Sequence, residues 1–240
     1  MTSEGQGGSI WMRPERAAAG RPAQRSRAEI TAAAIGIADR EGLDAVSMRR
    51  VAAELGTGAA SLYRYVDTRE ELLDLMSDAT GAEYSLPGPD DDWLAGLLAI
   101  AEQTRAIMRR HPWLPGLVLS RPVIGPNGLA VLDHYLALLE QHPADVAAKL
   151  EAFAMLNGMT ATFILHEQAG GAAFAERNVA YLRHALTSGE HPTLARLLSQ
   201  GPPPGGPAQP IDPADRFRDI LIRVLTALLG PIDQQQPPKG

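Results

Sequence analysis

The segment TGAASLYRYV, residues 57–66, carries the side chains in this chain whose types and spacing are best suited to chemistry. Helical spacing turns Leu62 and Val66 inward. The outward positions are Ala60, Ser61, Tyr63 and Arg64. A guanidinium can donate two hydrogen bonds to the edge of a guanine, and hydroxyl groups bind phosphate oxygens. The exposed face of this segment is therefore suited to contact with duplex DNA.

Two further helical patterns must position this segment. Before it, a narrow apolar stripe that includes Val51 and Leu55 ends at Gly56, where a helix C-terminus favours a residue tolerant of positive φ. After it, Thr68 and Glu71 have the spacing of a capping box that opens the next helix. That helix continues the apolar stripe with Leu72, Leu73, Met76 and Ala79. A short helix held between two others across tight breaks predicts a helix-turn-helix.

The charge is distributed unevenly along the 240 residues. The formal net charge is -6, but residues 1–69 hold 10 arginines and 8 acidic residues, net +2, and residues 70–240 hold 12 basic and 20 acidic residues, net -8. Five arginines lie close together near the start, at positions 13, 16, 21, 25 and 27. A polyanion is therefore expected to meet the amino-terminal third of the chain.

Several classes of protein are disfavoured by the sequence. The absence of cysteine rules out disulfides and thiolate metal sites. No apolar run approaches the roughly 20 residues that span a bilayer, and the start lacks a secretory signal, so we expect a cytoplasmic protein without membrane contact. His166 and Glu167 open a zinc-protease motif, but Gly170 stands where its second histidine is needed. We therefore expect no enzyme, no metal and no cofactor.

All recognisable periodicity is helical, which predicts an all-α fold of two unequal domains. Residues 1–25, rich in Gly, Pro, Arg and Ser, are expected to be a disordered basic arm. The amino-terminal domain is assigned to residues 26–84, the larger carboxy-terminal domain to residues 90–230, and a disordered tail to residues 231–240. The expected helices after the first domain are 91–110, 128–141, 144–168, 172–188 and a last one that begins at Pro213, after the N-cap Asp212, and ends before Gly230.

The order of motifs in residues 26–84 resembles the DNA-binding domain of the Tet repressor (TetR) family. It is carried by SMRRVAAELG at 47–56, SLYRYV at 61–66 and REELL at 69–73. A weaker likeness to the regulatory domain of the Tet repressor subgroup continues through residues 93–128. The resemblance implies a three-helix DNA-binding domain followed by a larger helical domain for ligand binding and dimerisation.

The resemblance also implies which residues contact DNA. It makes residues 57–65 the recognition helix, with Arg64 as the long donor nearest to a base edge, and lets Tyr63, Tyr65 and Arg69 reach phosphates. The candidate DNA-binding residues are Arg27, Arg49, Thr57, Gly58, Ala59, Ala60, Ser61, Tyr63, Arg64, Tyr65 and Arg69. Alternatives remain open, since the two tyrosines suit core packing, Arg49 and Arg50 suit a solvated face, and the arm's arginines suit either solubility or a minor groove.

For the second domain the resemblance implies a homodimer that binds a palindromic operator and is released by a small molecule. The dimer helices are expected at 144–168, which is apolar on nearly every side, and at 216–229. Polar groups on apolar helices suggest contacts with an apolar or amphiphilic inducer. The candidates are Thr104, Arg105, Trp113, His134, Asn157, Thr160, Phe163 and His166. Hydrogen bonding within the core remains the alternative for the polar ones, and helix packing for Trp113.

Two further hypotheses concern mechanism and class. The break at His111 and Pro112 lies between the expected pocket helices and is a candidate hinge for ligand-driven separation of the two DNA-binding domains. The alternative to a regulator is a helical module that binds a small molecule or a protein without binding an operator. Steep loss of DNA affinity with rising salt would distinguish the first class from the second.

Overall fold

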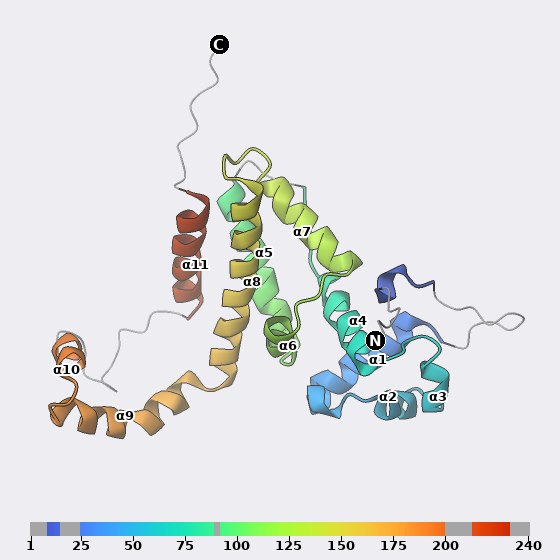
Figure 1. The fold of residues 1–240 in the computed structure, drawn as a ribbon, viewed down its shortest axis with the longest axis horizontal. Helices are drawn as coiled ribbons and strands as arrows, with labels where there is room; N and C mark the ends of the chain where they lie inside the picture. Colours follow the sequence, from blue (N-terminus) through green and yellow to red (C-terminus); the bar gives the residue numbers. More distant parts are fainter. Residues whose placement is uncertain (1–8, 15–24, 89–91, 200–212, 231–240) are drawn as a thin grey trace, which may run out of the picture.

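The computed structural model describes residues 9–14, 25–88, 92–199 and 213–230, with only the backbone described for 171–177 and 213–214. Every regular element in these ranges is a helix, and they contain no strand, which confirms the all-α prediction. The predicted tail at 231–240 lies outside the described residues. The short 3-10 helix η1, Ile10–Met12, precedes the helix-turn-helix region (Figure 1).

The amino-terminal unit consists of four α-helices and a 3-10 turn: α1 Arg27–Glu41, η2 Leu43–Ala45, α2 Met48–Glu54, α3 Ala59–Leu62 and α4 Arg69–Gly81. Ser26 and Glu29 form the full capping box of α1, because each side chain accepts a hydrogen bond from the other residue's backbone N–H. At Thr68 only half of the predicted capping box forms. Glu71 N–H donates to Thr68 Oγ1, but the Glu71 carboxylate accepts from Asp67 N–H and Arg13.

The larger unit contains the remaining helices: α5 Trp93–Arg110, α6 Leu114–Ser120, α7 Pro126–Leu138, α8 Val146–Gln168, α9 Gly171–Thr187, α10 Pro192–Leu198 and α11 Pro213–Leu229. Helix α8 lies against α5, α6 and α11, while α9 extends away from this bundle and has its main contacts with α8 and α10 (Figure 1). The sequence did not predict α6 or α10. Both carry a proline in the first turn, where its missing N–H and fixed φ are tolerated, so the prolines mark helix starts there.

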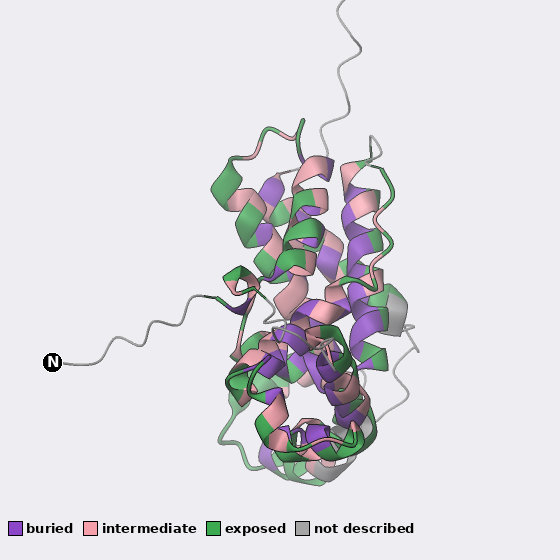
Figure 2. Ribbon diagram, turned by 90° about the vertical axis from the view of Figure 1, so that its right-hand side faces the viewer, coloured by how far each residue is buried: buried purple, intermediate pink, exposed green. Residues whose placement is uncertain are grey.

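Two apolar clusters form the core, and the first one crosses the boundary between the units. It joins α1–α4 to side chains of α5, α6 and α8, among them Met108, Leu117 and Ile164. The second cluster fills the space between α5, α7, α8 and α11. Figure 2 shows the buried residues running along the inner faces of these helices. Because the first cluster is shared, the DNA-binding unit is packed directly against the helices of the larger unit.

The prediction that residues 1–25 form a disordered arm is wrong for residues 9–14. Ile10 is 4% exposed within the first apolar cluster, and Arg13 forms ion pairs with Asp67 and Glu71. The buried side chain of Ile10 and the two ion pairs of Arg13 together dock this short stretch against the amino-terminal unit. Residues 1–8 and 15–24 lie outside the described residues.

A buried charge ties together three helices of the larger unit. Arg105 of α5 is 2% exposed, and its guanidinium carbon lies 5.1 Å from the ring centre of Phe217 and 5.5 Å from that of Phe163. It donates a hydrogen bond of 2.7 Å to Glu167, which also accepts from Arg109 at 3.0 Å. Burial alone would raise the pKa of Glu167, but the hydrogen bonds and charges of the two arginines outweigh it and hold that pKa below its ordinary 4.5.

Replacing Glu167 by Gln is expected to lower the free energy of unfolding at pH 7 by about 2 kcal/mol, because the buried guanidinium of Arg105 loses the nearer of its two carboxylates, and Glu102 remains 3.8 Å away. The depressed pKa of Glu167 means that its contribution is present above 4.5 and lost as pH falls through the folded-state value. We therefore expect urea unfolding, measured from above pH 4.5 down through the folded-state pKa of Glu167, to show that the free energy of unfolding depends less on pH in Glu167→Gln than in the wild type. The exposed Glu151 on the same helix provides the control, and equal losses in Glu167→Gln and Glu151→Gln would contradict the assignment.

Candidate nucleic-acid interface and ligand cavity

The regular part of the recognition helix is short, spanning Ala59–Leu62, and it continues as a turn to Val66. Leu62 and Val66 are fully buried beneath it, as the spacing predicted. Gly56, with φ of 64°, reverses the chain after α2, and Thr57 N–H then donates to Ala52 C=O at 2.9 Å. On the outer side Thr57 and Ser61 share a hydrogen bond of 2.9 Å, and Ala60 and Arg64 are exposed. The helix is thus held rigidly from below with a small, polar outer face.

The two candidate tyrosines lie in different environments. Tyr63 is 50% exposed, so its hydroxyl is free to reach a phosphate. Tyr65 is 5% exposed and belongs to the apolar core, although it also borders a surface recess. Most of the Tyr65 ring packs in the core, which fits the alternative left open for this residue. Any contact with DNA is limited to the edge of Tyr65 at that recess.

Two arginines predicted to contact DNA are engaged by backbone carbonyls instead. Arg27 donates from Nε to Tyr65 C=O at 3.0 Å and from a terminal nitrogen to Arg13 C=O at 2.7 Å. Arg69 donates to Val46 C=O at 2.8 Å and to Leu43 C=O at 3.0 Å. These two side chains therefore brace the loop ends of the helix-turn-helix, and their contact with phosphates stays a prediction. A sequence could not have revealed this, because the accepting carbonyls carry no side-chain signature.

Arg49 and Arg64 remain available for DNA. Both are exposed, and neither has an acidic partner within the described parts of the chain. Their neighbour Arg50 differs, because it pairs with Glu41 at 2.7 Å and Glu54 at 2.8 Å. The solvated-face interpretation therefore fits Arg50, whereas the outward guanidinium of Arg64 retains its donors for a base edge.

A polar recess of about 320 Å³ opens beside the recognition helix. Its lining residues are Arg25, Gly56, Thr57, Ser61, Arg64 and Tyr65, and no acidic residue is among them. Arg25 is fixed at its rim by a hydrogen bond of 2.6 Å to Leu55 C=O. Two guanidinium groups and hydroxyl groups around one hollow suit a backbone phosphate of DNA. Arg25 was predicted only as part of the basic arm, since no sequence pattern indicates its place next to Arg64.

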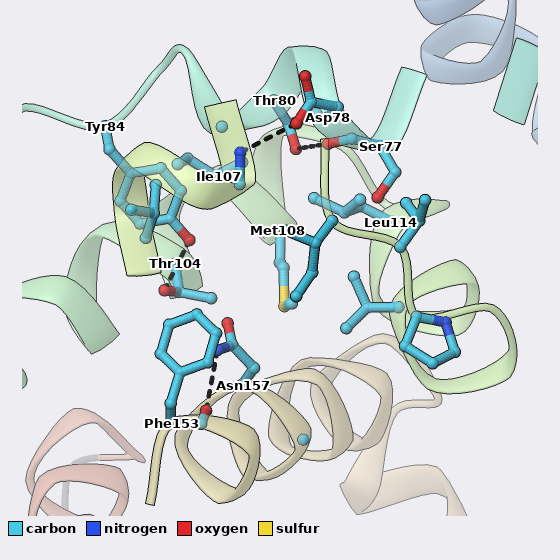
Figure 3. A pocket seen from close by; sticks show the side chains of 18 of the residues that line it. Ser77, Asp78, Thr80, Tyr84, Thr104, Ile107, Met108, Leu114, Phe153 and Asn157 are labelled. Carbon is cyan, nitrogen blue, oxygen red and sulfur yellow. Dashed lines mark hydrogen bonds between the residues drawn. The ribbon is translucent and has the colours of Figure 1, made fainter. Parts of the chain in front are cut away.

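A cavity of about 390 Å³ lies between the end of α4, α5, α6, the loop before α7 and α8. Its walls are mostly apolar, with Ile107, Met108, Leu114 and Phe153 among them (Figure 3). Polar groups occur at a few points. Tyr84 Oη and Thr104 Oγ1 are 2.8 Å apart, and Asn157 Nδ2 donates to Phe153 C=O at 2.9 Å (Figure 3). Burial raises the pKa of Tyr84, and the hydrogen bond with Thr104 offsets this only in part, so the phenol stays protonated.

Only two of the candidate ligand residues line this cavity, Thr104 and Asn157. Arg105 is bound to Glu167, Thr160 donates to Leu156 C=O at 2.7 Å, and Trp113 donates to Asp39 at 2.7 Å. These contacts fit the alternatives of core hydrogen bonding and helix packing, and a ligand contact of these three side chains stays a prediction. His134 lines neither this cavity nor the apolar groove between α6, α8 and α11. Asp78, Thr80 and Tyr84 also line the cavity but were not predicted to do so, because the sequence pattern places the end of α4 in the DNA-binding domain alone.

Phe163 and His166 lie instead in an apolar groove between α6, α8 and α11. The groove also contains Met155 and Leu119, which are 46% and 47% exposed. Further along α8, Val146 is 67% exposed and Leu150 is 42% exposed. The groove face of α8 is therefore uncovered in the single chain, while Val146 and Leu150 are exposed on the opposite side of the same helix.

The DNA-binding unit contacts the larger unit at the break between α5 and α6. His111 is buried between two carboxylates: Nδ1 lies 2.8 Å from Asp39 of α1, and Nε2 lies 2.7 Å from Glu83 after α4. The indole N–H of Trp113 donates to the same Asp39 oxygen. The predicted hinge at His111 and Pro112 is therefore tied directly to α1.

Neither a metal centre nor a membrane span is found among the described residues. No group of three or more histidine or acidic side chains there is arranged to hold a metal ion. No described helix combines the length and apolarity needed to cross a bilayer.

Comparisons with known proteins agree with this geometry. The family model for bacterial regulatory proteins of the tetR family matches residues 30–76, and the model for the tetracyclin repressor-like C-terminal domain matches residues 86–208. Fold and site together define a helix-turn-helix transcriptional regulator that binds DNA. The chain belongs to the TetR family.

Individual relatives cover much of the chain. It is 39% identical over 180 residues to the HTH-type transcriptional repressor DrrR1 of Streptomyces coeruleorubidus, covering 70% of this chain and 67% of that protein. It is 28% identical over 149 residues to the class A tetracycline repressor of Escherichia coli, covering 60% and 68% of the two chains. Apo ActR of Streptomyces coelicolor superposes with a TM-score of 0.72 at 30% identity, over 85% of this chain and 95% of ActR. ActR in complex with actinorhodin gives a TM-score of 0.70 at 30% identity, over 86% and 98%.

Two arginine substitutions should affect DNA binding differently. Arg64→Ala is expected to relax preference at one base position by roughly 1–3 kcal/mol, because a base-edge donor is lost. Arg25→Ala should weaken binding to every duplex and reduce the slope of log affinity against log salt by about 1, because it removes a phosphate contact. Fluorescence anisotropy with a panel of duplexes measures both quantities. Arg196→Ala, an exposed arginine of α10, is the control, and indistinguishable effects of Arg64→Ala and Arg25→Ala would contradict the roles.

Proposed function

We propose that this regulator is a repressor that binds a palindromic operator as a homodimer and is released by a small molecule in the cavity beside α4. The observation that carries the proposal is the position of α4, whose first turn follows the recognition helix and whose last turn forms part of the cavity wall. A ligand that binds more tightly to one position of α4 than to another shifts the helix toward that position. The resulting change in operator affinity is limited by the difference between the two ligand-binding free energies. Such a protein acts beside the chromosome, so we infer a cytoplasmic location.

The uncovered apolar surface supports a homodimer. Helices α8 and α11 pack together, and the exposed Met155 of α8 and Leu119 of α6 lie in the apolar groove beside them. A second copy related by a twofold axis would bury this surface and present two recognition helices together. Two such helices require half-sites separated by about one turn of DNA or a multiple of it.

The cavity supports an apolar or amphiphilic inducer. Its walls are apolar at most positions, and Thr104, Asn157 and Asp78 offer polar atoms at a few points, as is typical of small-molecule sites. The related ActR has been crystallised with actinorhodin and with (S)-DNPA. A related protein of this fold thus binds small organic molecules, which supports a ligand for this chain. The competing proposal, a binding module without an operator, lacks a comparable observation.

Selection of duplex fragments from the source genome with the purified protein tests the proposed function. We expect an inverted repeat, bound by two chains and lost steeply with rising salt. Scrambled duplex of the same length is the control. Binding of one chain per site, or equal affinity for the inverted repeat and the scrambled duplex, would contradict the proposal.

The free space in the cavity also predicts the effect of adding a methyl group at Gly158. This glycine lies within α8 and lines the cavity, and a Cβ atom there would meet nothing within 4 Å. Gly158→Ala should therefore raise the free energy of unfolding by about 0.5–1 kcal/mol, since glycine is unfavourable inside a helix. Gly81→Ala in α4 is the contrast, because its Cβ would lie 2.9 Å from Cβ and 3.1 Å from the backbone carbonyl carbon of Asn127, which cannot easily move, and it should destabilise. Chemical denaturation of both variants decides the point, and a loss of stability in Gly158→Ala would mean that the space beside it is occupied.

A further inference from the structure

We propose that residues Ser9–Pro14 form a positioning strap that connects the wall of the ligand cavity to the end of the recognition helix. The strap contains η1, and specific contacts hold it on both sides. One end engages the turn after α3, and the other touches the turn that begins α7. The inference deepens the proposed function, on which it rests for its DNA-binding readout.

Arg27 and Arg13 join the strap to the recognition helix. The Arg27 guanidinium donates to Tyr65 C=O at 3.0 Å, and it also donates to the strap carbonyls of Ile10 at 3.2 Å and Arg13 at 2.7 Å. The Arg13 side chain pairs with Asp67 and, at 2.7 Å, with Glu71. Tyr65 borders the recess beside Arg64. A shift of the strap therefore acts on the segment that leaves the DNA-binding face.

Trp11 joins the strap to the start of α7. A Cβ atom on Gly125 would lie 2.6 Å from Cζ2 of Trp11 and 2.5 Å from the carboxyl carbon of Asp78, so only glycine allows this close approach. Asp78 in turn accepts hydrogen bonds from Gly128 N–H at 2.9 Å and from Asn127 Nδ2 at 3.0 Å. The indole thus packs against the residue that begins the α7 turn.

The same turn is part of the cavity wall. Asp78, Ile124 and Gly128 all line the cavity, and Gly125 lies between the last two. A ligand that displaces this turn must either move Trp11 or break its contact, because the packing leaves no space for independent adjustment. The strap then carries the displacement to Tyr65 and Asp67 without passing along α4. It provides a second connection between the two sites.

The test compares Trp11→Ala and Arg13→Ala with Met12→Ala, whose side chain is 83% exposed in the same strap. Amide hydrogen exchange is followed in two peptides of the intact protein, residues 66–71 and residues 124–129. We expect Trp11→Ala to accelerate exchange in both peptides by about tenfold, including the one it does not touch, and Arg13→Ala to do the same from the other end. Met12→Ala should match the wild type. Trp11→Phe, which keeps an aromatic ring, should restore most of the protection.

Two further results decide the proposal. If each variant changes exchange only in its adjacent peptide, the strap is a local packing element and the proposal is overturned. Affinity for the selected inverted repeat should fall several-fold in Trp11→Ala for all sequences alike, because Trp11 positions the recognition helix and reads no base. An unchanged affinity with accelerated exchange at 66–71 would also overturn the positioning role. If the wild type prefers no inverted repeat, the proposed function fails, and the exchange data still decide whether the strap couples its two ends.

Discussion

Helix α4 is the constraint on which the rest of the structure depends, because two sites share one rigid element. Its 13 residues span about 20 Å, and Leu72, Leu73 and Met76 fix its inner face in the common core. Thr68 begins the helix directly after the recognition segment, and Asp78 near its end holds the first turn of α7. A rigid helix cannot change its setting at one end alone. Occupation of the cavity is therefore coupled to the position of the recognition helix.

The charges of the DNA-binding unit are divided between holding the fold and meeting DNA. Arg27 and Arg69 bind loop carbonyls, and Arg50 is held by two glutamates. What remains for a polyanion is a small set around the recess, chiefly Arg25 and Arg64. This arrangement explains how a chain with net charge -6 can present a cationic face: the internal pairs orient the scaffold, and few cations are directed outward.

The sequence predicted most of the helices, because each of those had a local cause, but it did not predict α6 and α10. Ser26 and Glu29 form a capping box, and Gly56 supplies the positive φ that separates α2 from α3. The sequence could not predict which partner a polar side chain finds across the fold. Arg105 was predicted to contact a ligand, but in the fold it donates a hydrogen bond to Glu167, which lies 62 residues away in the sequence. The docking of Ile10 likewise depends on core residues that are distant in the sequence. Asp78 and Tyr84 were missed for the same reason, since only tertiary packing brings the end of α4 to the cavity.

The most direct test of ligand control is a distance measurement on a dimer whose cavity is filled by mutation. The chain has no cysteine, so Ala32→Cys, at an exposed position of α1, gives one spin label per subunit. Asn157→Trp then fills the cavity without requiring a known inducer. The account predicts that the filled, folded dimer shows a changed distance between the two labels and weaker binding to the inverted repeat. An unchanged distance distribution and unchanged affinity in a folded Asn157→Trp dimer would contradict it.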